Sequence, residues 1–167
     1  LGAERGILHL HGALHLYFDG EIKKHCWSRT HKPLMDLIRE GLDNRRYPLF
    51  VAEGVPEKKL EQINSNAYLA YCLGKLGRIT NRLVVFGNTM GASDRHIAEV
   101  IADNLDIKEL YVGLFGDPHS QANKETVFTC EMIAGRRDMH NQKLRKPKAL
   151  NIQYFDSATV SIWGPNR

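Results

Sequence analysis

Three histidines near the start of the chain are the first residues whose types and spacing suggest chemistry. His9, His11 and His15 lie in the stretch GILHLHGALHLYF, where side chains alternate as they do along a β-strand. Alternation places His9 and His11 on one face, and two imidazoles on one face can bind a metal ion. A metal-dependent hydrolase that uses His9 and His11 is therefore one hypothesis. Strand histidines whose rings hydrogen-bond to the backbone are the simpler alternative.

His11 stands directly before Gly12, at the expected end of this strand. Because glycine has no side chain, a sugar or phosphate can approach the backbone closely beside it. The near-neutral pKa of an imidazole suits it to accept a proton from a ribose hydroxyl or a water molecule. The pair predicts His11 as a general base, with Gly12 next to the ligand.

The second candidate is the stretch RLVVFGNTMGASDRHI at residues 82–97. Its apolar run predicts a central parallel strand that helices cover on both sides. The polar turn that follows contains Gly87, Asn88 and Thr89, and Asp94 stands where a helix begins. Such turns hold phosphates and nucleotides in open α/β sheets. Asp94 would either accept a hydrogen bond from a ribose hydroxyl or cap the helix, and the turn itself would either bind a ligand or only connect two elements.

Two basic features give further candidates. Lys58 follows the expected strand at 48–52 and is placed to reach a phosphate, although a solvated helix start explains it equally well. Residues 136–148 hold six basic residues and one acid without interleaved aromatic side chains. This composition favours a solvated face over a nucleic-acid partner, which would need phosphate contacts along the segment.

The elements that must position these residues alternate along the chain. We expect strands at 7–11, 14–18, 48–52, 82–88, 109–115, 150–155 and 159–163, and helices at 33–42, 56–77, 94–104 and 122–140. Residues 21–32 have an irregular, polar pattern, after a turn at Asp19 and Gly20. This alternation predicts right-handed crossovers and one three-layer α/β/α Rossmann-like domain with a mostly parallel sheet over residues 1–167.

Composition narrows the class of protein. No apolar run approaches the roughly 20 residues of a membrane span, which argues against a membrane partner. The three cysteines, Cys26, Cys72 and Cys130, are widely spaced and form no CxxC pair, so we expect neither a disulfide framework nor a thiolate zinc site. Free thiols predict a reducing cytoplasm as the location of the protein.

Three motifs in order resemble a known family. They are LHG ending at Gly12, LFVAEG followed by Lys58, and VVFGNTMGASD ending at Asp94. Together they resemble the C-terminal part of the sirtuin-like NAD-binding domain, nearest to an uncharacterised bacterial sirtuin-like branch, over roughly residues 7 to 115. The resemblance implies NAD as substrate or ligand and His11 as the catalytic base. It also implies that Gly87, Asn88 and Thr89 contact the NAD phosphates and ribose, and Asp94 matches an aspartate of the bacterial motif.

Two departures from the family refine this expectation. Sirtuin deacetylases carry a four-cysteine zinc module, which these cysteines cannot supply, so we expect no zinc and favour the sirtuin-like NAD glycohydrolases, several of which act in bacterial anti-phage defence. The GAGxS loop and the Asn-Asp pair of the family's first half have no counterpart here. We therefore expect an incomplete half of the domain, inactive alone. A non-catalytic module that binds NAD or ADP-ribose, or that assembles as a homo-oligomer, is the alternative.

Overall fold

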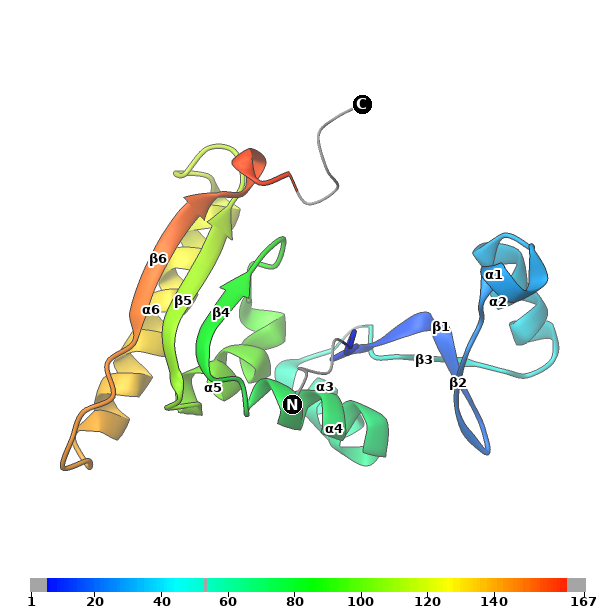
Figure 1. Ribbon diagram of the computed structural model, residues 1–167, viewed down its shortest axis with the longest axis horizontal. Coiled ribbons are helices and arrows are strands. Elements are labelled where there is room, and N and C mark those ends of the chain that lie inside the picture. Colours follow the sequence, from blue (N-terminus) through cyan, green and yellow to red (C-terminus); the bar gives the residue numbers. More distant parts are fainter. Residues whose placement is uncertain (1–5, 53, 162–167) are drawn as a thin grey trace. The chain divides into compact units, whose positions relative to one another are not determined.

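A computed structural model describes residues 6–52 and 54–161 of the chain. The protein is a mixed α/β structure whose strands form two separate three-stranded sheets. Its internal contacts divide it into two compact units, Leu1–Leu73 and Gly74–Arg167, which are coloured blue to green and green to red in Figure 1. Among the described residues, no helix has both the length and the apolar composition needed to cross a membrane.

The first unit is built on an antiparallel sheet with the order β2-β1-β3. Its strands are β1 (Gly12–Asp19), β2 (Glu21–Lys24) and β3 (Pro48–Phe50). The helices of this unit are α1 (Trp27–Thr30), α2 (Leu34–Asp43) and α3 (Pro56–Ser65), and α4 (Ala67–Leu76) runs on into the second unit. The predicted turn at Asp19 and Gly20 is confirmed, because β1 and β2 form a hairpin there and Gly20 has a φ of 72°.

Several predictions for the first unit are wrong. Residues 7–11 form no strand, because the Gly12 N–H donates to the His9 carbonyl at 3.0 Å and turns the chain just before β1 begins. The predicted break at Gly12 and Ala13 is instead the start of one continuous strand. Residues 21–24 are not irregular but form β2, since the hairpin supplies their backbone partners. The sheet around β1 is antiparallel, so it does not belong to the parallel sheet that was expected.

The second unit is built on a parallel sheet with the order β4-β5-β6. Its strands are β4 (Asn81–Val85), β5 (Ile107–Leu114) and β6 (Asn151–Asp156). Its helical segments are η1 (Ala92–Asp94), α5 (Arg95–Asp103), α6 (Gln121–Asn141) and η2 (Ser157–Thr159). The predicted last strand at 159–163 is wrong where the chain is described, because Thr159 ends η2 and residues 160–161 are irregular; Trp163 lies outside the described residues.

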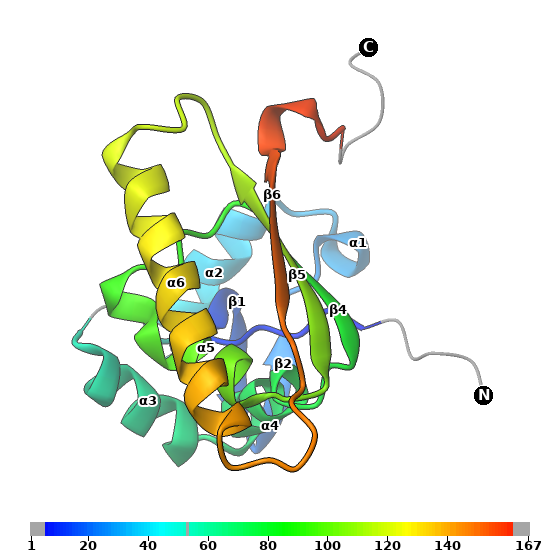
Figure 2. The same cartoon turned by 90° about the vertical axis from the view of Figure 1, so that its left-hand side faces the viewer.

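Helices α5 and α6 pack side by side over one face of the parallel sheet (Figure 2). The strand side chains beneath them include Leu110 and Val112, both fully buried. Helix α5 contributes Ile101 and helix α6 contributes Ile133, each 1% exposed. This helix layer and the sheet form the core of the second unit, and burial of such side chains is the main force that holds it together.

The strand at 82–88 is not central, as its apolar run predicted. Among the described residues, β4 is an edge strand that pairs only with β5, and Val84 and Phe86 are 55% and 42% exposed. An apolar run does not reveal which neighbours a strand has, because edge and central strands both need one apolar face. Within the described part of the second unit the sheet and helices form two layers, so a third layer stays a prediction.

One arginine is built into the core of the second unit. Arg137 of α6 is 1% exposed, and its guanidinium donates to the carbonyl oxygens of Ala102, Asn104 and Ile107 at 3.2, 2.6 and 3.3 Å. These carbonyls come from the end of α5 and the start of β5, where helical partners run out. Burial lowers the pKa of Arg137. The side chain therefore ties three elements together through their backbone carbonyls.

Candidate functional site

The backbone conformation of the turn between β4 and η1 is set by interactions within the protein. Gly87 follows the strand with a φ of 67°, a conformation that residues with a side chain rarely adopt. The Asn88 Oδ1 atom then accepts a hydrogen bond from the Met90 N–H at 2.6 Å. This Asx turn bends the backbone at the carboxyl end of a parallel strand, where Gly87, Asn88 and Thr89 are all exposed.

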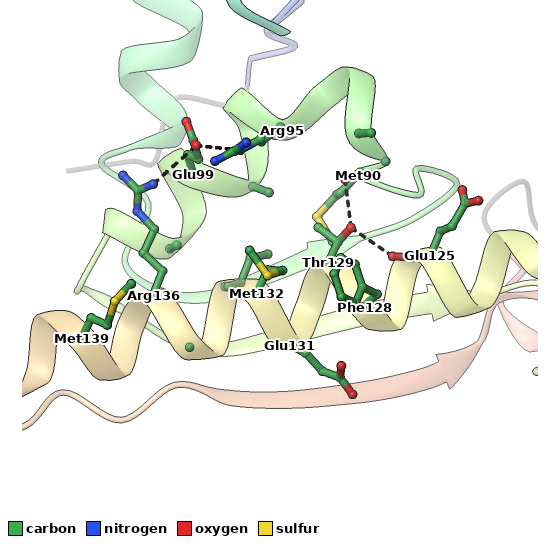
Figure 3. Close-up of a pocket in the computed structure, with 16 residues that line it drawn as sticks. Met90, Arg95, Glu99, Glu125, Phe128, Thr129, Glu131, Met132, Arg136 and Met139 are labelled. Atoms are coloured by element: carbon green, nitrogen blue, oxygen red, sulfur yellow. Dashed lines mark hydrogen bonds and ion pairs between the residues drawn. The ribbon is translucent and has the colours of Figure 1, made fainter.

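Met90 fixes this turn to the helix layer. Its side chain is 1% exposed, and its carbonyl accepts a hydrogen bond from the Thr129 hydroxyl of α6 at 3.3 Å (Figure 3). A Cβ atom at Gly91 would lie 3.3 Å from the Thr89 Oγ1 atom, so the turn is closely packed on itself. The predicted contacts at Gly87, Asn88 and Thr89 therefore sit on a supported backbone rather than on a free loop.

Asp94 occupies the N-cap position of α5, one residue earlier than the helix itself begins. Its side chain makes no capping hydrogen bond to α5, so the capping alternative is wrong for this helix. A carboxylate only accepts hydrogen bonds from neutral groups, which suits it to a ribose hydroxyl better than to a phosphate. The predicted ribose contact of Asp94 is compatible with this placement and stays a prediction.

His11 and Gly12 lie where β1 meets β3 in the first unit. The His11 carbonyl accepts a hydrogen bond from the Val51 N–H at 2.8 Å. Gly12 has a φ of 73°, and a Cβ atom there would overlap the carbonyl oxygen of Leu49. The space beside Gly12 that was predicted to receive a ligand is filled by β3. Strand pairing is therefore what requires a glycine at this position. The catalytic role of His11 stays a prediction.

The other histidines of the first unit form a cluster along β1. The rings of His9 and His15 meet edge to face with their centroids 5.1 Å apart, and His25 stacks on Tyr17 at 4.5 Å. Burial lowers the pKa of His15, and the charges of His9, Lys24 and His25 lower it further. Burial also lowers the pKa of His25, with help from Arg46. The surroundings of His15 and His25 therefore favour neutral imidazoles at these two positions.

The metal hypothesis for His9 and His11 loses its structural premise. The two residues were expected on one face of a strand, but both precede β1 and lie on no strand. His9 instead packs against His15, six positions further along the chain. The alternating pattern predicted a strand that a positive φ at Gly12 interrupts.

Lys58 is an exposed residue in the first turn of α3, where Pro56 occupies the first helical position as predicted. The strand before it, β3, belongs to an antiparallel sheet, so Lys58 does not stand over the carboxyl edge of a parallel one. Glu53 of the intervening loop lies outside the described residues. The phosphate contact of Lys58 stays a prediction.

The basic segment at 136–148 is used partly within the protein itself. Arg136 pairs with Asp103 at 2.6 Å, Lys148 pairs with Asp106 at 2.8 Å, and Arg137 is buried. The expected solvated face is therefore wrong for Arg137, whereas Arg136 and Lys148 stay partly exposed in their ion pairs. The acidic partners on α5 and before β5 had no signal in the linear sequence, because they lie more than thirty positions away.

An apolar groove between α5 and α6 was not predicted. It has a volume of about 840 Å³ and begins at Met90 and Gly91, the end of the turn described above. Figure 3 shows Phe128, Met132 and Met139 along its α6 wall. Thr129, which anchors the turn, also lines it. The spacing of these α6 residues was the signal that sequence reasoning missed, since it repeats every three or four positions.

The structure groups some of the predicted residues and leaves others apart in the chain. Gly87, Asn88, Thr89 and Asp94 share one turn and helix start in the second unit. His11 and Gly12 stand at the start of β1 and Lys58 stands on α3, all in the first unit. The turn after β4 is therefore the part of the predicted site whose internal geometry is defined.

Comparison with known proteins gives a family but no activity. A family described as a domain of unknown function, DUF4917, matches residues 2–163. The chain belongs to the DUF4917 family. No curated protein and no solved structure matches this DUF4917 chain. The function of this DUF4917 protein is therefore argued from the geometry and chemistry of its own residues.

Proposed function

We propose that this DUF4917 chain is part of a sirtuin-like, Rossmann-type domain that binds NAD or ADP-ribose at the turn after β4. The observation that carries the proposal is a parallel strand whose carboxyl end leads into a Gly87 turn of positive φ and then a helix. This is the place where open α/β sheets bind nucleotides. The motif order shared with the sirtuin-like superfamily supports the same site.

The chemistry of the turn suits a dinucleotide. Backbone N–H groups at a turn and at the start of α5 favour the negative charge of a pyrophosphate. The exposed Thr89 hydroxyl and Asn88 amide can donate to phosphate oxygens. Asp94, at the helix start, accepts from a ribose hydroxyl. The phosphates and one ribose of the ligand thus find partners of opposite hydrogen-bonding character.

We further propose that the complete protein hydrolyses NAD to nicotinamide and ADP-ribose. The bond between the ribosyl carbon and the nicotinamide nitrogen breaks, and its electron pair leaves with nicotinamide. Water then forms a bond to the ribosyl carbon and loses a proton to a general base. The resemblance, and not the geometry, assigns that base to His11. A role in bacterial anti-phage defence follows from the same resemblance.

Binding is tested by calorimetric titration of ADP-ribose and NAD into the chain. We expect Thr89→Val and Asn88→Ala each to weaken binding about tenfold, the loss of one hydrogen bond to a charged group. The matched control is Thr80→Val, an exposed threonine on the other side of β4. If the wild-type chain binds neither ligand, or if the turn variants bind as tightly as the control, the proposed site is wrong.

Hydrolysis is tested separately, by following nicotinamide release from NAD by the full-length natural protein. We expect His11→Ala to abolish release while ADP-ribose binding persists. Binding without release in the wild type would favour the non-catalytic sensing or assembly module instead. Equal release by wild type and His11→Ala would reject His11 as the base. Phage challenge of cells that carry either version then tests the defence role.

A further inference from the structure

Helix α6 is apolar on two faces, and the second unit covers only one of them. The face that packs on the sheet carries Thr126, Cys130, Ile133 and Arg137, all buried. The outer face carries Phe128, Met132 and Met139, which are 63%, 56% and 59% exposed. Gly135 completes this outer stripe, because it lies three residues after Met132 and four before Met139. Large apolar side chains gathered on one exposed stripe indicate an interaction surface.

The groove beside this stripe has the shape that a helix needs. Its α5 wall combines the small side chains of Ala98 and Ala102 with the charged side chains of Arg95 and Glu99. The larger apolar side chains of α6 form the other wall (Figure 3). Grooves of this kind accept an apolar helix face through positions three and four residues apart. The stripe of α6 is itself such a face. The surface therefore supplies both the groove and a helix that fits it.

We propose that a second copy of this chain docks here, with the two α6 helices antiparallel about a two-fold axis between residues 133 and 134. This register places Phe128 opposite the second copy's Met139, and Met132 opposite the second copy's Gly135. A Cβ atom at Gly135 would meet no atom within 4 Å, so there is open space above it for a methionine side chain. Met132 thus faces a glycine of the other copy and Phe128 faces a methionine, so the apolar stripe is complementary to itself, as a two-fold contact requires.

The charges along the stripe agree with the same register. In this register Glu125, near one end of α6, comes opposite the second copy's Gln142. The next residue, Lys143, lies in a turn closed by a hydrogen bond from its N–H to the His140 carbonyl at 3.1 Å, so its side chain is within one position of Glu125. Neither Glu125 nor Lys143 forms an ion pair with another described residue. The rim cation Arg136 already pairs with Asp103 and Glu99, at 2.6 and 3.5 Å. Docking therefore adds two opposite-charge contacts and leaves none of these rim charges without a partner.

The first test is sedimentation velocity over a series of chain concentrations. We expect reversible dimerisation of the wild-type chain, weakened at least about 30-fold by Met132→Glu, as at a central interface residue. The matched control is Met35→Glu, at a methionine of α2 that is 53% exposed, and it should leave the dissociation constant unchanged. A chain that stays monomeric at every concentration overturns the proposal, as does Met132→Glu dimerising as tightly as the wild type.

A second set of variants tests the register and does not depend on Met132. Gly135→Leu should fold, because no atom lies within 4 Å of a Cβ there, and it should weaken dimerisation by filling the space for the opposing methionine. Glu125→Lys and Lys143→Glu should each weaken dimerisation several-fold at low salt, and the double variant should restore it. Failure of the double variant to recover affinity overturns the antiparallel register.

Discussion

The two units of this DUF4917 chain use their signature glycines for different purposes. In the first unit, Gly12 is fixed by contact, because the Leu49 carbonyl occupies the space where a side chain would be. In the second unit, Gly87 has open space around it and is fixed only by its φ of 67°. The same residue type in a motif therefore marks strand pairing in one unit and an exposed, preset turn in the other. Only the second leaves room for a ligand.

The units also differ in how they hold charge. Unit two buries Arg137 among backbone carbonyls and pairs Asp103 with Arg136. Unit one gathers His15, His25 and neighbouring cations along β1, where burial lowers the pKa of both imidazoles. The pairing with Arg136 lowers the pKa of Asp103 and so favours its charged form, whereas the surroundings of His15 and His25 disfavour their charged forms.

The largest expected effect is at Arg137. Arg137→Met removes a buried guanidinium and its hydrogen bonds to the carbonyls of Ala102, Asn104 and Ile107, which should destabilise the second unit by about 3 to 5 kcal/mol. Hydrogen exchange followed by segment should show faster exchange in α5 and β5 and unchanged exchange in β1. Equal exchange rates in variant and wild type would mean that the buried guanidinium does not stabilise the contact between α5, α6 and β5.

The next effect compares the two glycines directly. Gly12→Ala forces a side chain into the Leu49 carbonyl and should cost the first unit about 2 to 4 kcal/mol. Gly87→Ala meets no atom and should cost the second unit only about 1 kcal/mol of backbone strain. Urea unfolding monitored by segment-resolved hydrogen exchange measures both. Similar losses of unfolding free energy at the two positions would contradict the distinction between a glycine required by steric contact and one required by its positive φ.

A pH series separates the units by the pH range in which each loses stability, since both lose it as the pH falls. Since the pKa of His15 and of His25 is lowered from 6.5, the unfolded chain binds more protons than the folded one below that pH. The stability of the first unit should therefore fall as the pH drops below 6.5. The pKa of Asp103 is lowered from 3.8 chiefly by its hydrogen bond to Arg136, so that contribution to the second unit is lost only in stronger acid.

The measurement is segment-resolved hydrogen exchange at pH 7.5, 6.0 and 5.0, corrected for the intrinsic rate. β1 should lose protection first, and His15→Gln with His25→Gln should flatten its pH dependence. Parallel loss of protection in β1 and β5 would show that the histidine cluster does not govern the stability of the first unit.

The smallest expected effect is at Gly74 of α4, which has a negative φ and no atom within 4 Å of a Cβ. Gly74→Ala should stabilise the chain by about 0.5 to 1 kcal/mol, because alanine loses less conformational freedom in a helix. A rise in the thermal midpoint is the expected reading. Destabilisation would indicate a steric requirement that the open space around Gly74 does not reveal.

Much of the second unit could be predicted from sequence because its signals are local. The helix predicted at 122–140 is α6 to within one residue at each end, and the strands around β5 and β6 follow from apolar runs and their stops. The exposed edge position of β4 could not be predicted, since strand order depends on long-range pairing. The same limit hid the first unit's antiparallel sheet, because alternation does not indicate the direction of a neighbouring strand.

The candidate site, too, could be predicted only where its signals are local in the sequence. The Gly87 turn was predicted from a local strand-turn-helix pattern, and the structure gives it a defined backbone. Its anchor was missed, because Met90 and Thr129 are 39 positions apart and meet only in the folded chain. At Gly12 the sequence predicted open space, but the neighbouring strand that fills it was invisible in the motif.

The most direct test of the central claim is hydrogen exchange of the chain with and without saturating ADP-ribose. Backbone amides between Gly87 and Arg95 should exchange more slowly with the ligand, because phosphate oxygens would accept their hydrogen bonds. Thr80, before β4, should exchange at the same rate in both states. Protection confined to the turn and helix start is the predicted result. Unchanged exchange there at saturating ligand, or protection only in other segments, would contradict the claim that this turn binds the dinucleotide.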